Sequence, residues 1–418
     1  MAEWQTVRLG EIVKTNQSTY SPKENWQFVN YLDTGNITMN KIDEIQNINT
    51  AKDKLPSRAR RKVKTNSIIY STVRPNQLHY GIIKKQPDNF LVSTGFTVID
   101  VNYDKAVPDF IYYALTKQEV TEQLQTIAEQ SVSAYPSLKP SDIENLELML
   151  PDKKTQERIV AILRSIDEKI KENNAINNNL EQQAVVLFRS WFSAFSLSPN
   201  SPHVDSEFGE IPESFAVVKV GSLPMLITDY VANGSFASLK ANVNLYQEPN
   251  YAYFIRNTDL KSGSYGVFVD QHSYEFLSKS TLYGGEIIIS NVGDVGSVFL
   301  CPKLDGRMTL GNNIIMLRPQ DDHLRYYLYI WFKYLQGQAL IQGIKGGSAQ
   351  PKFNKTDFKN TSVLIPPKDI LTRFHETVAP MFEMISQRQA ETAQLTDLRD
   401  TLLPQLMSGE IDVSSLDL

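Results

Sequence analysis

Side chains that commonly carry catalysis are few in this 418-residue chain, and their spacing does not suit a catalytic or metal site. Cys301 is the single cysteine, which excludes an internal disulfide and a multi-thiolate metal site. The sequence contains neither the G-x-x-x-x-G-K-S/T loop that binds a triphosphate nor the G-x-G-x-x-G turn that binds a dinucleotide. We therefore expect no catalytic residue, no metal ligand and no cofactor in the chain itself. The histidines, which never stand at metal-ligand spacing, are His79, His203, His272, His323 and His375.

One acidic group matches a loose nuclease pattern. Asp152 follows a proline, and Asp167 stands two residues before Lys169, as in the Pro-Asp and Asp-x-Lys pattern of metal-dependent nucleases. There, two carboxylates hold a magnesium ion and the lysine steadies the attacking water. That arrangement needs adjacent strands, whereas Asp167 and Lys169 lie inside the strongest helical pattern of the chain. We interpret them as charges on a solvated helix face; metal-dependent cleavage by the purified chain would favour the nuclease alternative.

The binding of anions is a second kind of chemistry, and one local patch offers it. The stretch KDKLPSRARRKVK places seven cations against a single carboxylate, Asp53. Such a run is more often a solvated loop than a binding site, so the pattern alone does not decide. The cations are Lys52, Lys54, Arg58, Arg60, Arg61, Lys62 and Lys64.

The bulk composition is typical of a folded, soluble chain that is not basic. Hydrophobic residues make up 41% and charged residues 21%, the net charge is −5, and the pI is about 5.7. Any nucleic-acid contact must therefore be local or shared with a partner. No apolar run approaches the ~20 residues that span a bilayer, and MAEWQTVRLGEI lacks the features of a secretion signal. We expect a cytoplasmic protein with no membrane contact.

Two distant stretches are nearly the same. SAYPSLKPSDI (133–143) aligns without a gap with SAQPKFNKTDF (348–358), at an offset of 215 residues that also relates Pro151 to Pro366. Leu9-Gly10 and Val220-Gly221 open two similar strand-like runs, and NSIIYSTVRP and GEIIISNVGD each predict a strand followed by a polar turn. Each repeated stretch ends in a predicted helix N-cap, Ser141-Asp142 or Thr356-Asp357. A duplicated half is the simplest explanation.

Two segments of helical character separate and follow these repeats. Each carries an apolar stripe over about 38 residues, which is on the order of 55 Å of helix. Because neither helix can bury its stripe alone, we predict that the two pack together as an antiparallel coiled coil. An asparagine-rich centre near Asn173 leaves a bent or disordered middle as an alternative, and Pro380 and Pro404 indicate a kink or a later start. The stripes are Ile159, Ile162, Ile166, Ile176, Leu180 and Leu187, and Phe374, Val378, Met381, Ile385, Leu395, Leu398 and Leu402.

The predicted fold class is therefore α/β (α+β), with two similar mixed domains separated by two long helices. The expected segments are a first domain at 1–150, a helix at 151–195, a linker at 196–211, a second domain at 212–366, and a helix with a C-terminal tail at 367–418.

This arrangement, with LRSIDEKIKENN after PDKKTQERIV and the tail LRDTLLPQLMSGEI, resembles the specificity subunit of a type I restriction-modification system. The resemblance covers essentially the whole chain, although the α/β domains support it only through their pattern. It implies that each domain is a target recognition domain that reads one half of a split, asymmetric DNA sequence, while the helices set the gap. It also implies two modification subunits with S-adenosylmethionine for adenine N6 methylation, and restriction subunits with ATP and magnesium, around a subunit that is not an enzyme.

Candidate DNA contacts follow from side-chain chemistry. Arginine and lysine can hold guanine, and asparagine and glutamine can hold adenine, through paired hydrogen bonds. The strand-end turns and the second repeated stretch offer such groups, and the basic run offers phosphate contacts. The candidates are Arg74, Asn76, Gln77, His79, Tyr80, Asn291, Lys345, Ser348, Gln350 and Lys352 near the turns, and Arg58, Arg60, Arg61, Lys62 and Lys64 for phosphates. The alternative from another class is an interaction scaffold of two ligand-binding domains on a coiled coil, with no DNA involved.

Overall fold

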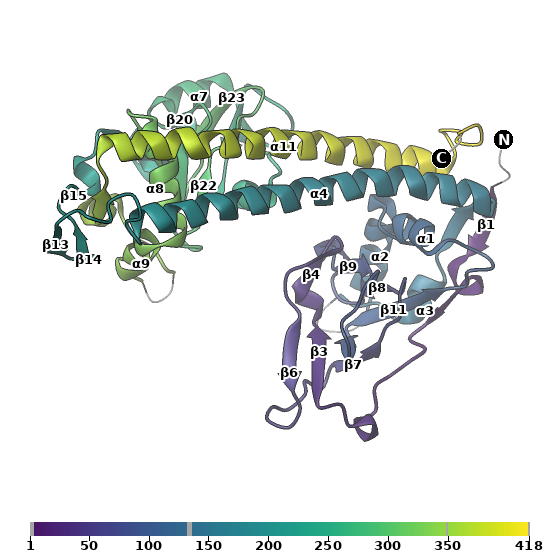
Figure 1. Cartoon of the computed structure of the whole chain (residues 1–418). Helices are drawn as coiled ribbons and strands as arrows, with labels where there is room; N and C mark the ends of the chain where they lie inside the picture. Colours follow the sequence, from purple (N-terminus) through teal and green to yellow (C-terminus); the bar gives the residue numbers. More distant parts are fainter. Residues whose placement is uncertain (1–3, 132–135, 348–349, 417–418) are drawn as a thin grey trace. The chain divides into compact units, whose positions relative to one another are not determined.

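The computed structural model describes residues 4–131, 136–347 and 350–416 of the chain. It divides into two compact units: unit 1 is Met1–Lys169 with Leu395–Leu418, and unit 2 is Ile170–Gln394. Each unit contains a mixed α/β domain, and two long helices, α4 (Lys153–Phe192) and α11 (Lys368–Ser408), supply residues to both units (Figure 1). The predicted fold class is confirmed.

Two four-stranded sheets form the domain of unit 1. The first has the order β2-β11-β8-β9 and is antiparallel throughout. The second has the order β6-β3-β10-β7, and its β3 and β10 run parallel. The strands are β1 (Gln5–Arg8), β2 (Val13–Thr15), β3 (Phe28–Leu32), β4 (Ile37–Thr38), β5 (Lys41–Ile42), β6 (Gln46–Asn49), β7 (Ala59–Lys62), β8 (Ile68–Ser71), β9 (Tyr80–Ile82), β10 (Phe90–Ser93), β11 (Phe96–Val101) and β12 (Glu147–Leu150), and the helices are α1 (Pro108–Leu115), α2 (Gln118–Glu129) and α3 (Pro140–Glu144).

The domain of unit 2 also contains two sheets, but its second sheet has five strands and its helices differ from those of unit 1. Its antiparallel sheet has the order β16-β24-β21-β22, and a second sheet has the order β17-β19-β18-β23-β20, with β18 and β23 parallel. The strands are β13 (His203–Ser206), β14 (Gly209–Pro212), β15 (Ala216–Lys219), β16 (Met225–Asp229), β17 (Leu245–Tyr246), β18 (Ala252–Ile255), β19 (Phe268–Val269), β20 (Thr281–Leu282), β21 (Ile287–Ser290), β22 (Val298–Leu300), β23 (Arg307–Leu310), β24 (Ile314–Pro319) and β25 (Ser362–Ile365), and the helices are α5 (Phe236–Asn242), α6 (Asn257–Ser262), α7 (Gln271–Phe276), α8 (His323–Tyr334), α9 (Gln336–Gly343) and α10 (Lys355–Asn360).

The two predicted strand-and-turn runs are buried strands inside the antiparallel sheets. Every residue of β8 and of β21 is buried. A strand covered on both faces needs such a continuous apolar run rather than alternation. The polar residues that follow each run therefore leave the sheet at its edge and form the turns described below.

In both domains a strand near the start of the domain pairs with the last strand. β1 pairs with β12 in unit 1, and β15 pairs with β25 in unit 2, antiparallel in both cases. A Cβ atom at Gly10 would lie 3.2 Å from the Glu144 carbonyl oxygen, and one at Gly221 would lie 3.1 Å from that of Lys359. Only glycine allows this close approach without displacing the neighbour. The duplication predicted from the repeats is present in the fold.

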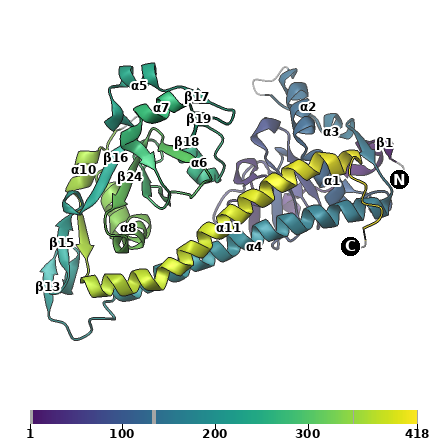
Figure 2. The same cartoon turned by 90° about the horizontal axis from the view of Figure 1, so that it is seen from above.

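Within each unit, α4 and α11 lie side by side (Figures 1 and 2). In unit 1, Ile159 and Leu163 of α4 share a core with Leu406 of α11. In unit 2, the ring of Phe188 on α4 lies 5.7 Å from that of Phe374 on α11, inside a second core. The predicted antiparallel coiled coil is confirmed.

Both helices are longer and more regular than their residues suggested. α4 continues without a break through Asn173, so the predicted long helix is present and the alternative of a bent or disordered middle is wrong. α11 continues through Pro380 and Pro404, which shows no later start. A helix that packs along its whole length tolerates the missing amide of a proline because neighbouring turns and tertiary contacts hold it.

The segment expected to be a linker, 196–211, contains most of a hairpin formed by β13 and β14. Phe208 from its turn packs against Trp331 with ring centroids 5.3 Å apart, at nearly a right angle. The residues rich in serine, proline and aspartate therefore form the turns around a hairpin and not an unstructured linker. In the described residues, no helix is long and apolar enough to cross a membrane.

We predict that Gly337→Ala destabilises unit 2. A Cβ atom there would lie 2.6 Å from the Trp331 carbonyl oxygen and 2.4 Å from Cδ1 of its buried ring. Overpacking of this kind costs about 1–3 kcal/mol, so the midpoint of urea unfolding should fall. Gly343 ends the same helix, and a Cβ atom added there would meet no other atom within 4 Å, which makes Gly343→Ala the matched control. Equal midpoints for the two variants would contradict the prediction.

Candidate nucleic-acid interface

The repeated stretches hold a strand-end turn in both units. In unit 1 the Arg74 amide donates to the Pro136 carbonyl at 3.1 Å, and the Leu138 amide donates to the Thr72 carbonyl at 2.7 Å. Residues 72–79 are named turn 1. Because these bonds involve only the backbone, they fix the course of the turn without constraining which side chains it carries.

The equivalent bonds recur in unit 2. There the Gly293 amide donates to the Pro351 carbonyl at 2.9 Å, and the Phe353 amide donates to the Asn291 carbonyl at 3.0 Å. Residues 290–297 are named turn 2. The repeat that stands out in the sequence is thus a loop that positions a turn. The N-cap residues of the adjoining helices α3 and α10 are Lys139 and Asn354 rather than the predicted ones. The Asp142 side chain accepts from the Lys139 amide, and the Asn354 side chain accepts from the Asp357 amide.

Turn 1 is strained and presents polar side chains. Arg74 and Leu78 have φ angles of 49° and 57°, a left-handed conformation that is uncommon for side chains of this size. Between them lies a single 3₁₀ turn, Pro75–Gln77, whose Asn76 amide donates to the Gln125 side chain of α2 at 3.2 Å. Arg74, Asn76 and Gln77 are exposed. Strained backbone that the surroundings enforce is frequent at functional sites, which supports turn 1 as one.

The two remaining candidates of turn 1 point inward. His79 is half-buried, and its Nδ1 lies 2.6 Å from the Ile37 carbonyl oxygen. Tyr80 is only 4% exposed and stacks on Tyr70, with ring centroids 5.6 Å apart. Burial raises the pKa of Tyr80 to about 12. The expectation that Tyr80 contacts DNA is therefore wrong, because Tyr80 begins β9, a strand whose residues are all buried.

Two lysines of the basic run, Lys62 and Lys64, are paired with carboxylates. Lys62 forms an ion pair with Glu24 and lies 5.0 Å from the centre of the Trp26 ring. The hydrogen bond from Lys62 lowers the pKa of the Glu24 carboxyl. Lys64 lies 3.5 Å from a carboxylate oxygen of Asp100. Both lysines would have to leave an acidic partner before they could contact a phosphate.

The arginines of the same run differ from the lysines. The Arg61 Nε is buried without a hydrogen-bond partner in the described part of the chain, and burial lowers its pKa. Neither Arg58 nor Arg60 forms an ion pair or a side-chain hydrogen bond with any described residue, although the charge of Arg58, which is exposed, acts on the Asp33 carboxylate. Of the five candidates for phosphate contacts, Arg58 and Arg60 are therefore the two best placed for an outside anion.

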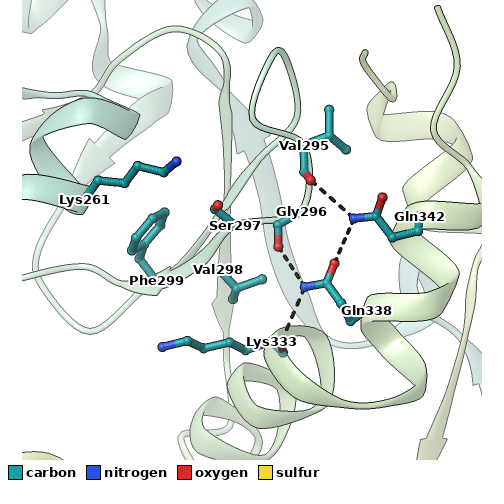
Figure 3. A pocket seen from close by; sticks show the side chains of 9 residues that line it. All are labelled: Lys261, Val295, Gly296, Ser297, Val298, Phe299, Lys333, Gln338 and Gln342. Carbon is teal, nitrogen blue, oxygen red and sulfur yellow. Dashed lines mark hydrogen bonds between the residues drawn. The ribbon is translucent and has the colours of Figure 1, made fainter. Parts of the chain in front are cut away.

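Turn 2 is held from its other side by two glutamines of α9. The Gln338 amide donates to the Gly296 carbonyl at 2.8 Å, and the Gln342 amide donates to the Val295 carbonyl at 3.3 Å (Figure 3). Gln338 and Gln342 thus hold the backbone of turn 2 by side-chain hydrogen bonds, as Gln125 holds the backbone of turn 1. None of these three glutamines was predicted from the sequence, because each lies more than 40 residues from the turn that it supports.

A cavity of about 460 Å³ opens beside turn 2, and its cations are already neutralised. Lys261 pairs with Asp294 at 2.6 Å, and Lys333 pairs with Glu181 at 2.8 Å. Figure 3 shows both lysines at this cavity, near Ser297 and Phe299. An anion would have to displace a carboxylate from each lysine, so the cavity is not built to hold one.

The candidates of unit 2 are distributed unevenly. Asn291 is half-buried; its amide nitrogen lies 3.4 Å from the Phe353 carbonyl and its Oδ1 is buried, so it does not present its amide to a ligand. Lys345, Gln350 and Lys352 are exposed. Ser348 lies outside the described residues.

The residues of the nuclease pattern do not form a metal site. Asp152 accepts hydrogen bonds from the backbone amide and hydroxyl of Thr155 at the start of α4, which lower the pKa of its carboxyl. Asp167 binds the Tyr113 hydroxyl at 2.6 Å and Arg399 at 3.2 Å. The two carboxylates stand 15 residues apart in sequence, or on the order of 22 Å along a helix. They hold α4 in place instead.

Two similar domains, each presenting a turn fixed by the same repeated loop, define a duplicated recognition protein. A family model described as the type I restriction modification DNA specificity domain matches residues 1–182 and 227–391. The chain therefore belongs to this family of DNA specificity subunits.

Individual relatives agree with this assignment. The type I restriction enzyme HindI specificity subunit of Haemophilus influenzae is 27% identical, over 98% of this chain and 100% of that protein. The type I restriction enzyme MjaIX specificity subunit of Methanocaldococcus jannaschii is 28% identical, over 81% of this chain and 76% of that protein. The crystal structure of the type I restriction-modification system S subunit from M. genitalium matches with a TM-score of 0.54 at 16% identity, over 97% of this chain and 96% of that chain, and shows that the fold is shared.

Proposed function

We propose that the two domains read the two halves of a split and asymmetric DNA target. The observation that carries this proposal is the equivalent bonding of turn 1 and turn 2 to Pro136 and Pro351, combined with different side chains on the two turns. Because the backbone of the two turns is held in the same way, both domains would approach a duplex with the same geometry. Because the side chains on the turns differ, the two domains would read different base sequences.

In this proposal the paired helices α4 and α11 set the length of the unread gap. Spacing between two contact surfaces fixes the spacing of half-sites on a duplex. Helices of 40 and 41 residues that pack along one another are stiff enough for this task.

The chain acts as a recognition subunit and not as an enzyme. Two modification subunits supply S-adenosylmethionine-dependent adenine N6 methylation, and restriction subunits supply ATP- and magnesium-dependent cleavage. The family assignment supports these partners. The acidic net charge of −5 also favours DNA binding that is shared with partner subunits.

The experiment that tests the function is a methylation map. The chain is co-expressed with a type I modification subunit in cells that lack adenine methylation, and N6-methyladenine is mapped by single-molecule sequencing. A motif of two different halves with one fixed gap is the expected result. Purification of the intact complex without any new methylation would overturn the proposal in favour of the interaction scaffold.

We predict that Arg74→Ala relaxes recognition in one half of the target only. Arg74 is exposed at the strained start of turn 1, where its side chain can bond one base pair. Loss of such a contact costs about 1–3 kcal/mol of discrimination. The methylation map should then show one degenerate position in one half-site, and equal loss in both halves would contradict the role. Lys105→Ala, which removes an exposed cation of the same domain that binds the Glu11 carbonyl, is the control.

We predict that replacing both Arg58 and Arg60 by alanine weakens binding to all sequences alike. If each contacts a phosphate, the slope of log affinity against log salt concentration should fall by about 2. The complex with the modification subunit is titrated with DNA between roughly 50 and 200 mM salt, the range over which this effect is large. Lys62→Ala, which removes a cation already paired with Glu24, should change the slope less. A larger change for Lys62→Ala would reverse the assignment of the phosphate contacts.

A further inference from the structure

The seam between α4 and α11 is polar where α4 enters unit 2. Buried positions of α4 recur at spacings of three and four, and two of them are asparagines: Asn173 is 0% exposed and Asn177 is 8% exposed. They lie between the apolar residues Ile166 and Ala184 on the same helix face. In a coiled coil these are the positions that apolar side chains normally fill.

Asn173 binds α11 through both ends of its amide. Its Nδ2 donates to the Glu391 Oε2 at 2.9 Å, and its Oδ1 accepts from the Arg388 Nη1 at 3.2 Å. Asn173 and Arg388 are 215 residues apart, which is the offset of the duplication itself. Equivalent residues of the two halves therefore face one another here, so this layer is the local centre of the antiparallel pair.

The same region carries polar atoms that the fold leaves unsatisfied. Both amide atoms of Asn177 and the Nε of Arg388 are buried without a hydrogen-bond partner in the described residues. Each such group lowers stability, and apolar residues of similar size would pack better. A polar layer in an apolar seam is best known for choosing one register at the expense of stability.

A register shift shows what the layer excludes. Because the apolar stripes repeat every seven residues, a slip of one heptad would again bring apolar positions of the two helices together, although it would also displace the helix ends from the two domain cores. It moves the helices by about 10 Å, the length of roughly three base pairs. After such a slip Asn173 would stand opposite Met381 or Leu395, and neither can bond an amide. A second directional contact joins the two helices in unit 1, where Asp167 of α4 pairs with Arg399 of α11 at 3.2 Å. The aromatic contact of Phe188 with Phe374 in unit 2 is not directional in this way.

We propose that Asn173, Arg388 and Glu391 form a register lock that makes this subunit accept a single gap length between its two half-sites. The inference rests on the proposed function and adds to it the residues that determine spacing. The three side chains touch no base; they act by fixing the pairing of the two helices on which the spacing depends.

The test uses the full chain with its modification subunit and the methylation map as readout. In the double variant Asn173→Leu with Arg388→Leu, apolar side chains replace the polar layer. We expect the same two half-site sequences, but methylation at gaps other than the parental one rising about tenfold relative to the parental gap, the factor that loss of one charge-assisted hydrogen bond produces. The melting temperature of the complex should stay equal or rise, because the buried polar atoms of Asn173 and Arg388 are removed while the half-buried Glu391 carboxylate can still reach water. A role that is only structural would lower the melting temperature and leave the gap unchanged.

A single variant and a control keep the test decisive. Asn173→Ala removes both hydrogen bonds with a good helix former and should also relax the gap, although with a lower melting temperature because Arg388 loses a partner. Asn178→Ala changes an exposed asparagine of the same helix. It should leave unaltered both the gap length and the ratio of methylation at other gaps to methylation at the parental gap. Methylation by both seam variants at the parental gap alone would overturn the register lock. Absence of any split motif with the parental chain would instead count against the proposed function.

Discussion

The structure depends on the burial of two apolar stripes, one on α4 and one on α11. Helices of 40 and 41 residues cannot leave such stripes in water, and in each unit the two helices share a core with the domain. Their ends then become parts of the domain cores: Leu163 and Leu406 belong to one core in unit 1, and the rings of Phe188 and Phe374 meet in the core of unit 2. Each domain is therefore built onto the helix pair rather than tethered to it.

Hydrogen bonds add a defined orientation to the apolar packing of each domain on α4. In unit 1, Asp167 of α4 binds the Tyr113 hydroxyl of α1, and in unit 2, Glu181 of α4 binds the Tyr329 hydroxyl of α8. Burial raises the pKa of each tyrosine most, and the neighbouring carboxylate raises it further. Apolar packing alone permits small rotations of a helix against a domain, whereas a hydrogen bond to a carboxylate has a defined geometry. Each domain is thus oriented on the helix by the same kind of bond.

A shared framework with different turns lets one fold present two different sets of side chains. The bonds from the Pro136 and Pro351 loops reach only backbone atoms, so the side chains of turn 1 and turn 2 are free to differ. Support from Gln125 in one unit and from Gln338 and Gln342 in the other keeps both turns in place by different means. Rigid backbone with changeable side chains is what recognition of base edges requires.

Part of the site could be predicted from residue types, and part could not. The exposed groups of turn 1, Arg74, Asn76 and Gln77, were predicted because a polar turn after a buried strand reaches solvent whatever the tertiary structure. Tyr80 and Asn291 were assigned wrongly, since the direction of a side chain at the start of a strand or inside a turn depends on local register and on a distant partner. The pairing of Lys62 with Glu24 likewise joins residues 38 positions apart.

By itself, the sequence determined the duplication, the mixed α/β class and the two helices, because repeats and apolar periodicity are properties of the order of residues. Tertiary structure alone decided that Asn173 lies in a seam, that Pro380 is tolerated inside a helix, and that 196–211 contains part of a hairpin. The reason is that burial, and the hydrogen bonds that burial demands, come from segments far apart in the chain, such as Asn173 and its partner Arg388, 215 residues away.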